Sequence, residues 1–205
     1  LRRGAGARAL RPARAPGRRE AMIATVPNML TALRIAAAPC LVVPFLVAER
    51  PAADIAAFAL FAAAAATDFL DGWLARRLDQ GSAVGAMLDP VADKAMVTIA
   101  LALLMALHGP AAWLAVPVAL ILAREVLVSG LREHLGQVSL AVTPLAKGKT
   151  AAQMVAIGVL LLAPALGGWA LWAGAALLWL AAALTVLSGG DYMRKALAYI
   201  AEREA

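Results

Sequence analysis

Cysteine, aromatic residues and charged residues are all scarce in this chain of 205 residues. The one cysteine, Cys40, cannot form a disulfide within the chain and lies in an apolar run, so we expect a small buried side chain there and no sign of an oxidising compartment. Aromatic residues make up 5% of the chain and charged residues 16%, whereas 63% is hydrophobic and the mean hydropathy is +0.79. This composition excludes a soluble domain of this size and indicates a protein that crosses a membrane several times.

Alanine and leucine supply much of this apolarity, and both favour helix over strand. Only helices and closed barrels can cross a bilayer, so the composition predicts an all-α bundle. A helix needs about 20 apolar residues to span the hydrocarbon core. We predict a polytopic membrane bundle of six transmembrane helices, at residues 28–47, 55–78, from the turn at 79–85 to about 107, 111–131, 150–166 and 169–187, followed by a polar tail from Ser188. Pro39 and Pro44 should bend the first of them.

The basic residues are distributed by membrane topology. In a soluble protein, a net charge of +6 and a pI near 10.2 would suggest nucleic-acid binding. Here nearly all the lysines and arginines of the connections fall on one side of the predicted helices. The positive-inside rule places that side, with both termini and the acidic segment described below, in the cytoplasm. We therefore predict no nucleic-acid partner.

Residues 1–21 differ in composition from the rest of the chain. They carry seven arginines in a stretch rich in alanine, glycine and proline, with no apolar period, which predicts disorder. They do not resemble a secretory signal. An upstream extension, an anchor to anionic lipids and an artefact of the gene start all stay open as explanations. Residues 22–205 are predicted to form a single membrane domain.

Four aspartates lie in segments that are otherwise apolar enough for a membrane, where charges are costly. In a helix that ends near residue 78, Asp68 and Asp71 share one face, and Asp89 and Asp93 form an i, i+4 pair on the next helix. The two acidic faces can meet across the short turn. Their repulsion calls for a counterion, and oxygen ligands without histidine or cysteine favour Mg²⁺ or Mn²⁺, which usually serve phosphate chemistry.

A plainer explanation of these charges needs no metal. Asp68 and Asp71 would pair with Arg76 and Arg77 as ordinary charges at a helix end. Asp89, which precedes a proline, would be the N-cap of the following helix.

Polar residues also interrupt the first predicted helix. Asn28, Thr31 and Arg34 recur at a spacing of three residues and should line one helical face. That face is either solvated at the lipid headgroups or turned toward a ligand.

Two further polar groups stand in the second half of the chain. Arg124 and Glu125 fall inside an apolar helix and should face the bundle interior, either as an ion pair or as functional groups. Lys147 and Lys149 flank a glycine at a predicted helix start. That position suits the binding of a phosphate, although ordinary positive-inside charge explains it as well.

The acidic segment matches a specific pattern of fixed spacing, D-x2-D-G-x2-A-R-x8-G-x3-D-x3-D. Its eight defined positions are Asp68, Asp71, Gly72, Ala75, Arg76, Gly85, Asp89 and Asp93. On these residues the chain resembles the CDP-alcohol phosphatidyltransferase family, over about residues 27–191. Residues 124–132, 147–157 and 184–192 most resemble the members that make phosphatidylglycerophosphate.

The resemblance implies a reaction and a set of roles. The phosphatidyl group of CDP-diacylglycerol would pass to the primary hydroxyl of sn-glycerol 3-phosphate, releasing CMP without a covalent enzyme intermediate. Asp68, Asp71, Asp89 and Asp93 would hold two Mg²⁺ or Mn²⁺ ions, and Asp93 would also be the general base. The nucleotide and its diphosphate would be bound by Gly72, Ala75, Arg76, Gly85, Asn28, Thr31 and Arg34, and the acceptor phosphate by Arg124, Arg132, Lys147 and Lys149. The family further implies a homodimer in the bacterial cytoplasmic (inner) membrane.

Two alternative functions stay open on the sequence. A sibling phosphatidyltransferase would use another acceptor and make cardiolipin, phosphatidylserine or a phosphatidylinositol phosphate. A small proton- or cation-coupled transporter would also place carboxylates in the membrane, but it predicts them near the middle of helices. The four aspartates lie instead near helix ends, which favours a reaction at the headgroup layer.

Overall fold

The structure, a computed structural model, describes residues 25–78, 83–135 and 144–204, and all regular structure in these ranges is helical. The helices are α2 (Val26–Cys40), α3 (Pro44–Val47), α4 (Ala52–Leu78), α5 (Ala83–His108), α6 (Ala112–Leu135), α7 (Pro144–Leu166) and α8 (Gly168–Glu204). The all-α prediction is confirmed. The basic leader predicted at residues 1–21 lies outside the described residues.

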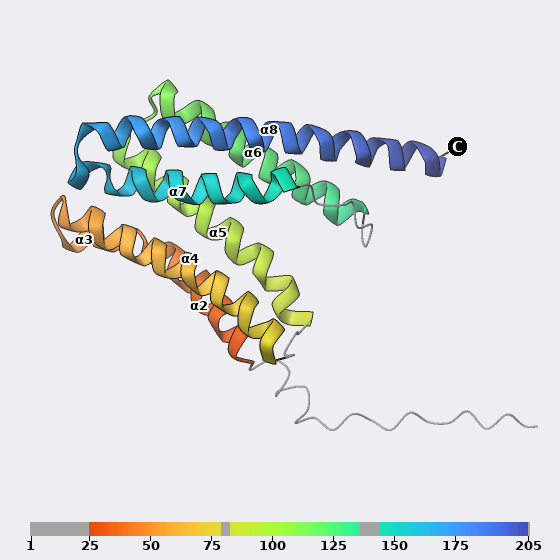
Figure 1. Cartoon of the computed structure of the whole chain (residues 1–205), viewed down its shortest axis with the longest axis horizontal. Coiled ribbons are helices and arrows are strands. Elements are labelled where there is room, and N and C mark those ends of the chain that lie inside the picture. The colour runs from red at the N-terminus through yellow and green to blue at the C-terminus, as the bar shows by residue number, and fades with distance from the viewer. Residues whose placement is uncertain (1–24, 79–82, 136–143, 205) are drawn as a thin grey trace, which may run out of the picture.

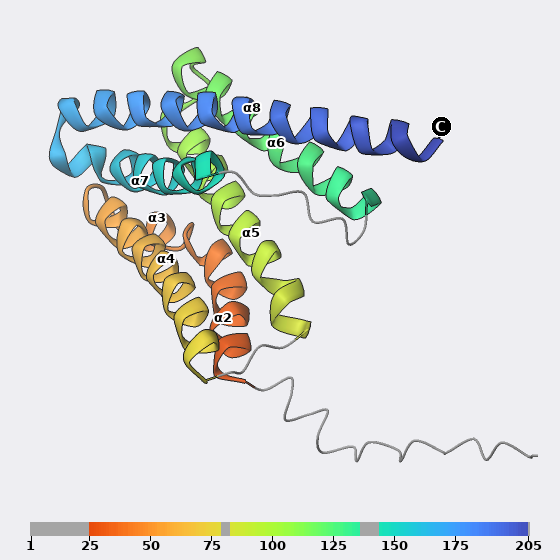
Figure 2. The same ribbon diagram turned by 45° about the vertical axis from the view of Figure 1, so that its right-hand side comes forward.

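Helix α5 joins the two halves of the bundle (Figure 1). On one side it packs against α2, which also contacts α4. On the other side it packs against α6 and α7, and α8 lies along both of these helices. Figure 2 shows α2, α3 and α4 as a group below α7 and α8, with α5 running from one group to the other. The two halves also meet directly, where α4 contacts α7.

The two ends of the bundle differ in chemistry. One end gathers the last turns of α4, α6 and α8 and the first turns of α5 and α7 (right in Figure 1). We call it the acidic end, because α4 and α5 bring the four aspartates to it. The turns after α3, α5 and α7 lie at the opposite end. Trp169 and Trp172, at the start of α8, are 66% and 73% exposed there, as is typical of aromatic side chains at a membrane interface.

Within the described residues, four segments are long and apolar enough to cross a membrane: Met87–His108, Ala112–Leu135, Gly148–Leu166 and Gly168–Glu202. The chain is therefore a multi-pass membrane protein. The first predicted span is shorter than expected, because α2 has 15 residues and covers about 22 Å of a core about 30 Å thick. The count of six spans and the side on which the termini lie stay predictions.

Proline interrupts the first apolar segment, as predicted. Helix α2 begins after Thr25, whose hydroxyl accepts a hydrogen bond from the Asn28 amide at 3.4 Å. It ends at Cys40, one residue after Pro39, and α3 begins at Pro44. The prediction that Cys40 is buried is wrong: its side chain is exposed, so it lies on a face of α2 that no described helix covers.

Helix α5 begins earlier than the sequence suggested. The turn expected at residues 79–85 gives way to helix at Ala83, so Gly85 and Asp89 lie inside α5 and Pro90 is an interior proline. Asp89 is therefore not an N-cap, and the plainer explanation of this residue is wrong. At the other end of the chain, the tail expected from Ser188 is helical as well. Its residues continue α8 to Glu204, and the 37 residues of this helix extend about 55 Å, well beyond a bilayer core.

Small residues set the spacing of the helices that carry the site. A Cβ atom on Gly174 of α8 would lie 2.7 Å from Leu160 Cγ of α7, and one on Gly158 of α7 would lie 3.2 Å from the ring of Phe58 of α4. Close packing through glycine and alanine is typical of membrane helices, which cannot rely on the hydrophobic effect between them. These contacts hold α7 against both halves of the bundle and so fix the position of its first turns at the acidic end.

Candidate active site

The polar face of α2 is buried and turned toward the aspartates. Asn28, Thr31 and Arg34 are 5%, 1% and 2% exposed. The prediction that these residues share a face is confirmed. The alternative of a solvated or headgroup-facing side is wrong, because buried polar groups need partners within the protein.

Arg34 and Thr31 bind the carboxylates of α4 and α5. Arg34 Nη1 donates to Asp68 Oδ1 at 2.5 Å and to Asp93 Oδ1 at 2.9 Å, so one guanidinium joins both acidic helices. The Thr31 hydroxyl donates to Asp89 Oδ1 at 2.7 Å. The side chains of Asp68 and Asp93 remain 48% and 54% exposed. Asp68 and Asp93 are therefore bound by α2 on the side that faces the bundle and are exposed on the opposite side.

This role of Arg34 differs from the predicted one, in which a metal is the counterion of the aspartates and Arg34 binds the nucleotide. The feature of the sequence that could have indicated this role is the spacing of Asn28, Thr31 and Arg34. It places an arginine on the same helical face as two residues that can form hydrogen bonds. Direct contact of this face with the nucleotide stays a prediction.

For several predicted site residues the structure describes the backbone but not the side chain. Asp71, Gly72, Ala75 and Arg76 belong to the last turns of α4, and their side chains are outside the described part. The same holds for Lys147 in the first turn of α7. Their assigned roles stay predictions. Gly85, also assigned to the nucleotide, is buried near the start of α5.

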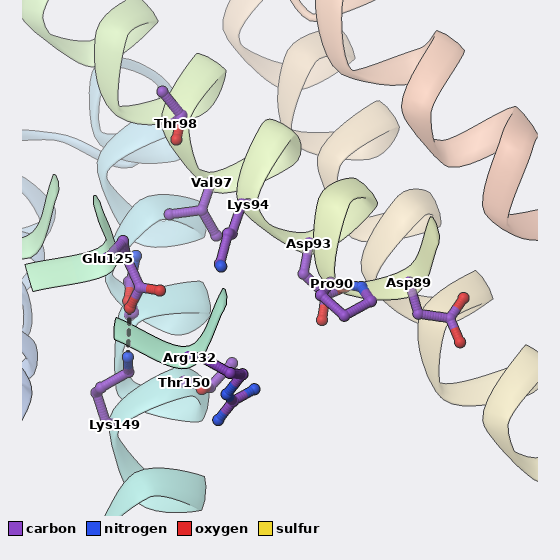
Figure 3. A pocket seen from close by; sticks show the side chains of 11 residues that line it. Asp89, Pro90, Asp93, Lys94, Val97, Thr98, Glu125, Arg132, Lys149 and Thr150 are labelled. Carbon is purple, nitrogen blue, oxygen red and sulfur yellow. Dashed lines mark hydrogen bonds and ion pairs between the residues drawn. The ribbon is translucent and has the colours of Figure 1, made fainter. Parts of the chain in front are cut away.

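A cavity of about 340 Å³ opens beside the aspartates, between α5, α6 and α7 (Figure 3). Its acidic wall contains Asp89 and Asp93 of α5. Cationic side chains come from all three helices. The complete lining is Asp89, Pro90, Asp93, Lys94, Val97, Thr98, Glu125, Arg132, Lys149, Thr150 and Gln153. A cavity with carboxylates on one side and three cations on the other can hold a metal and an anion next to each other.

Two of the residues predicted to bind the acceptor phosphate line this cavity, Arg132 and Lys149. Arg124, the third whose side chain is described, does not. Its Nη1 donates to Glu125 Oε1 at 3.2 Å, and its Nη2 lies 3.5 Å from the Ser188 hydroxyl of α8. The cavity adds a further cation, Lys94 of α5, which is not among the predicted site residues.

An apolar cavity of about 420 Å³ lies between α4 and α7. It is lined by Phe58, Phe61, Ala62, Ala65, Met154, Val155, Gly158, Val159, Leu162 and Leu166. Ala65 is one helical turn from Asp68, and Met154 is little more than one turn from Lys149. The apolar cavity therefore begins close to the charged site and continues into the membrane.

The chemistry of the aspartates fits a divalent metal. Asp68, Asp89 and Asp93 offer hard oxygen donors and their described neighbours include no soft ligand, which suits Mg²⁺ or Mn²⁺. Among the side chains that the structure describes, no group of three potential ligands is close enough to hold an ion by itself. Asp71, the fourth aspartate of the pattern, is outside that set.

These features define a class of protein: a helical membrane protein with a charged site at one end of the bundle, carboxylates and cations around one cavity, and an apolar cavity beside it. The sequence model of the CDP-alcohol phosphatidyltransferase family matches residues 24–187. The chain belongs to this family.

Relatives cover nearly the whole chain. A protein of Cereibacter sphaeroides named CDP-diacylglycerol–glycerol-3-phosphate 3-phosphatidyltransferase is 46% identical, over 88% of this chain and 99% of its own. Proteins of the same name from Pseudomonas fluorescens and Escherichia coli K12 are 44% and 41% identical, over 83% and 84% of this chain and 89% and 95% of theirs.

Proposed function

We propose that this protein transfers the phosphatidyl group of CDP-diacylglycerol to sn-glycerol 3-phosphate, giving phosphatidylglycerophosphate and CMP. Family membership and the relatives' names support the reaction. The observation that carries it in this chain is the cavity wall. Asp89 and Asp93 of the acidic pattern share one cavity with Lys94, Arg132 and Lys149. A lipid diphosphate at the aspartates and a phosphate monoester at the cations would therefore lie next to each other.

The acceptor explains why three cations face this cavity. Glycerol 3-phosphate carries about two negative charges at neutral pH, as phosphate monoesters do. A neutral acceptor such as serine needs no such cluster. Arg132 can bind a phosphate through two parallel hydrogen bonds, whereas Lys94 and Lys149 act as compact point charges.

Asp93 would serve as the base. It lines the cavity, it is 54% exposed, and Arg34 holds one of its oxygens. The acceptor's primary hydroxyl would give its proton to the Asp93 carboxylate while its oxygen attacks the phosphorus that bears the diacylglycerol. The bond from that phosphorus to the CMP oxygen breaks, and CMP leaves with the bonding electrons. Arg34 keeps Asp93 and Asp68 in place during this exchange.

The metal and the membrane topology are further parts of the proposal. Asp68, Asp71, Asp89 and Asp93 would hold two Mg²⁺ or Mn²⁺ ions, which would neutralise the diphosphate and stabilise the leaving CMP. The remaining two of six spans would come from α2 with α3 and from α4. The acidic end would face the cytoplasm, as the positive-inside rule predicts, in a bacterial inner membrane. The homodimer that the family resemblance implies is tested by light scattering of the purified protein in detergent.

The decisive experiment is an assay of the purified protein with labelled CDP-diacylglycerol and a panel of acceptors. Glycerol 3-phosphate should give a labelled phosphatidylglycerophosphate and stoichiometric CMP. Serine, inositol phosphate and phosphatidylglycerol should give no product. Turnover with one of these instead would assign the chain to a sibling reaction, and failure with every acceptor would overturn the proposed function.

A further inference from the structure

Glu125 is an unexpected residue in the wall of a cavity for a phosphate ester. It lines the same space as Lys94, Arg132 and Lys149, and a carboxylate there repels an incoming dianion. It also cancels one of three positive charges that the acceptor needs. The acceptor would bind more tightly without it, unless Glu125 contributes something that outweighs this repulsion.

Glu125 is tied to both lysines of the cavity wall. Its Oε1 accepts a hydrogen bond from Lys149 Nζ at 2.5 Å, drawn as the dashed line in Figure 3. Its backbone carbonyl accepts a hydrogen bond from the Ser129 hydroxyl at 2.5 Å, and the Ser129 oxygen in turn accepts one from Lys94 Nζ. The two ammonium groups are thus held to one turn of α6, although Lys94 comes from α5 and Lys149 from α7.

Glu125 is itself held from the side away from the cavity. Arg124 Nη1 donates to the same Oε1 at 3.2 Å. The Arg124 side chain is 16% exposed and lies against the backbone of α8. A Cβ atom on Gly189 would lie 2.7 Å from Arg124 Cγ and 3.3 Å from its Nε. Only glycine at position 189 therefore leaves Arg124 in its place. Contacts thus run from Gly189 of α8 to Arg124 and Glu125 of α6, and from Glu125 to the cavity.

We propose that Glu125 is a positioning residue of the acceptor site, whose carboxylate holds the ammonium group of Lys149 at the cavity wall and is itself held by Arg124 seated on Gly189. A lysine has a flexible stem, and fixing it only when the acceptor arrives costs affinity. The Glu125 carboxylate fixes Lys149 beforehand, whereas Lys94 is held through Ser129 and the backbone of α6. The inference rests on the proposed function, because it concerns how that function's acceptor is recognised.

Replacement of Glu125 separates positioning from simple repulsion, since the two predict opposite signs. If the Glu125 carboxylate positions Lys149, Glu125→Ala raises the KM for glycerol 3-phosphate about tenfold, the loss expected for one charge-assisted hydrogen bond. The KM for CDP-diacylglycerol stays within about twofold, because its site at the aspartates is unchanged. Glu125→Gln keeps an oxygen that can accept from Lys149 and restores part of the affinity. An unchanged or lowered KM for glycerol 3-phosphate in folded Glu125→Ala overturns the inference.

Gly189→Ala tests the chain of contacts without changing any residue of the cavity. The new methyl group displaces Arg124, and a small displacement of a positioned group is enough to raise the KM for glycerol 3-phosphate, here by roughly fivefold. Gly190→Ala is the matched control. It makes the same change one residue further along α8, where an added Cβ meets nothing within 4 Å. Equal effects of the two substitutions on this KM would overturn the role of α8.

All four variants are assayed beside the wild type, with thermal unfolding in detergent as the check on folding. Wild-type protein that does not use glycerol 3-phosphate refutes the proposed function itself. Wild-type protein that uses it, with folded variants that leave its KM unchanged, refutes only the positioning role. If Gly189→Ala does not fold, the two Glu125 variants still decide the inference.

Discussion

Arg34 Nη1 lies 2.5 Å from Asp68 Oδ1 and 2.9 Å from Asp93 Oδ1, so a single nitrogen of α2 holds together the acidic faces of α4 and α5. Arg34 is 2% exposed, whereas the two carboxylates are about half exposed. The guanidinium thus occupies the bundle side of the acidic group and leaves the outer side open. This arrangement lets the carboxylates stand close together before any other cation is bound.

Arg34→Ala should reduce kcat/KM by about 100-fold, because the loss of the bridge lets two reacting carboxylates shift, and a displacement of about 1 Å can cost that much. Arg50→Ala is a matched control at the opposite end of the bundle. Arg50 pairs with the fully buried Asp54 at 2.7 Å, so its loss should lower the unfolding temperature but not the activity of the folded protein. Steady-state kinetics and thermal unfolding of both variants check this. Equal losses of activity would show that Arg34 matters only for folding.

Thr31→Val should lower kcat/KM about tenfold while the fold persists. Valine keeps the shape of threonine but removes the hydrogen bond of 2.7 Å to Asp89, and a hydrogen bond to a charged group contributes about 1.5–3 kcal/mol. Thr31→Ser retains the hydroxyl and should keep most of the activity. If serine and valine behave alike at this position, the bond to Asp89 does not support the reaction.

The acidic pattern and the helical class could be read from the sequence because both depend on local spacing. Apolar composition fixes the helical class, and i, i+3 and i, i+4 spacing fixes which aspartates share a face. The same reasoning found the buried face of Asn28, Thr31 and Arg34 but not its partners. Which carboxylate each of them binds depends on how α2 packs against α4 and α5, and spacing along one helix carries no information about that packing.

The helix boundaries and the part of the site on α6 and α7 could not be predicted from local spacing. The plainer explanation of Asp89 as an N-cap puts Pro90 in the first turn of a helix, but α5 accommodates this proline in its interior, because packing can outweigh a local preference. The apolar helix around Arg124 predicts only that its charge faces the interior, and the family resemblance implies that it binds the acceptor phosphate. The structure turns it toward α8 instead, where Gly189 leaves room. This fit depends on how α6 packs against α8, and the two residues that meet there are 65 positions apart in the chain.

Asp93→Asn should lower kcat by a factor of about 10²–10⁴, the range of general-base catalysis, because asparagine cannot accept the proton of the attacking hydroxyl. Binding of Mn²⁺, followed by its paramagnetic resonance signal, should be largely retained, since other aspartates remain as ligands. Near-normal turnover would remove Asp93 from the role of base.

Removal of divalent metal should abolish turnover, because the proposed carboxylate site needs a cation to neutralise the lipid diphosphate. Activity is measured after dialysis against a chelator and again after addition of Mg²⁺ or Mn²⁺, with Zn²⁺ as the soft-metal comparison. We expect the two hard ions to restore activity and Zn²⁺ to fail. Full activity in the presence of excess chelator would contradict the metal site and leave Arg34 as the counterion of Asp68 and Asp93.

Ala65→Trp should raise the KM for CDP-diacylglycerol about tenfold and leave the KM for glycerol 3-phosphate unchanged. Ala65 lines the apolar cavity between α4 and α7, one turn from Asp68. We propose that this cavity holds an acyl chain of the lipid substrate, which an indole at position 65 would exclude. Loss of contact for two methylene groups, at about 0.8 kcal/mol each, is enough for this change.

The control for this substitution is Ala63→Trp. Ala63 is exposed on the same helix and outside the apolar cavity, so an indole there meets lipid and should leave both KM values unchanged. A CDP-diacylglycerol with short acyl chains supplies a second control, because a chain that ends before the cavity loses nothing when it is filled. If Ala65→Trp affects short and long chains equally, the cavity does not hold the acyl chain, and the lipid must lie on another face of the bundle.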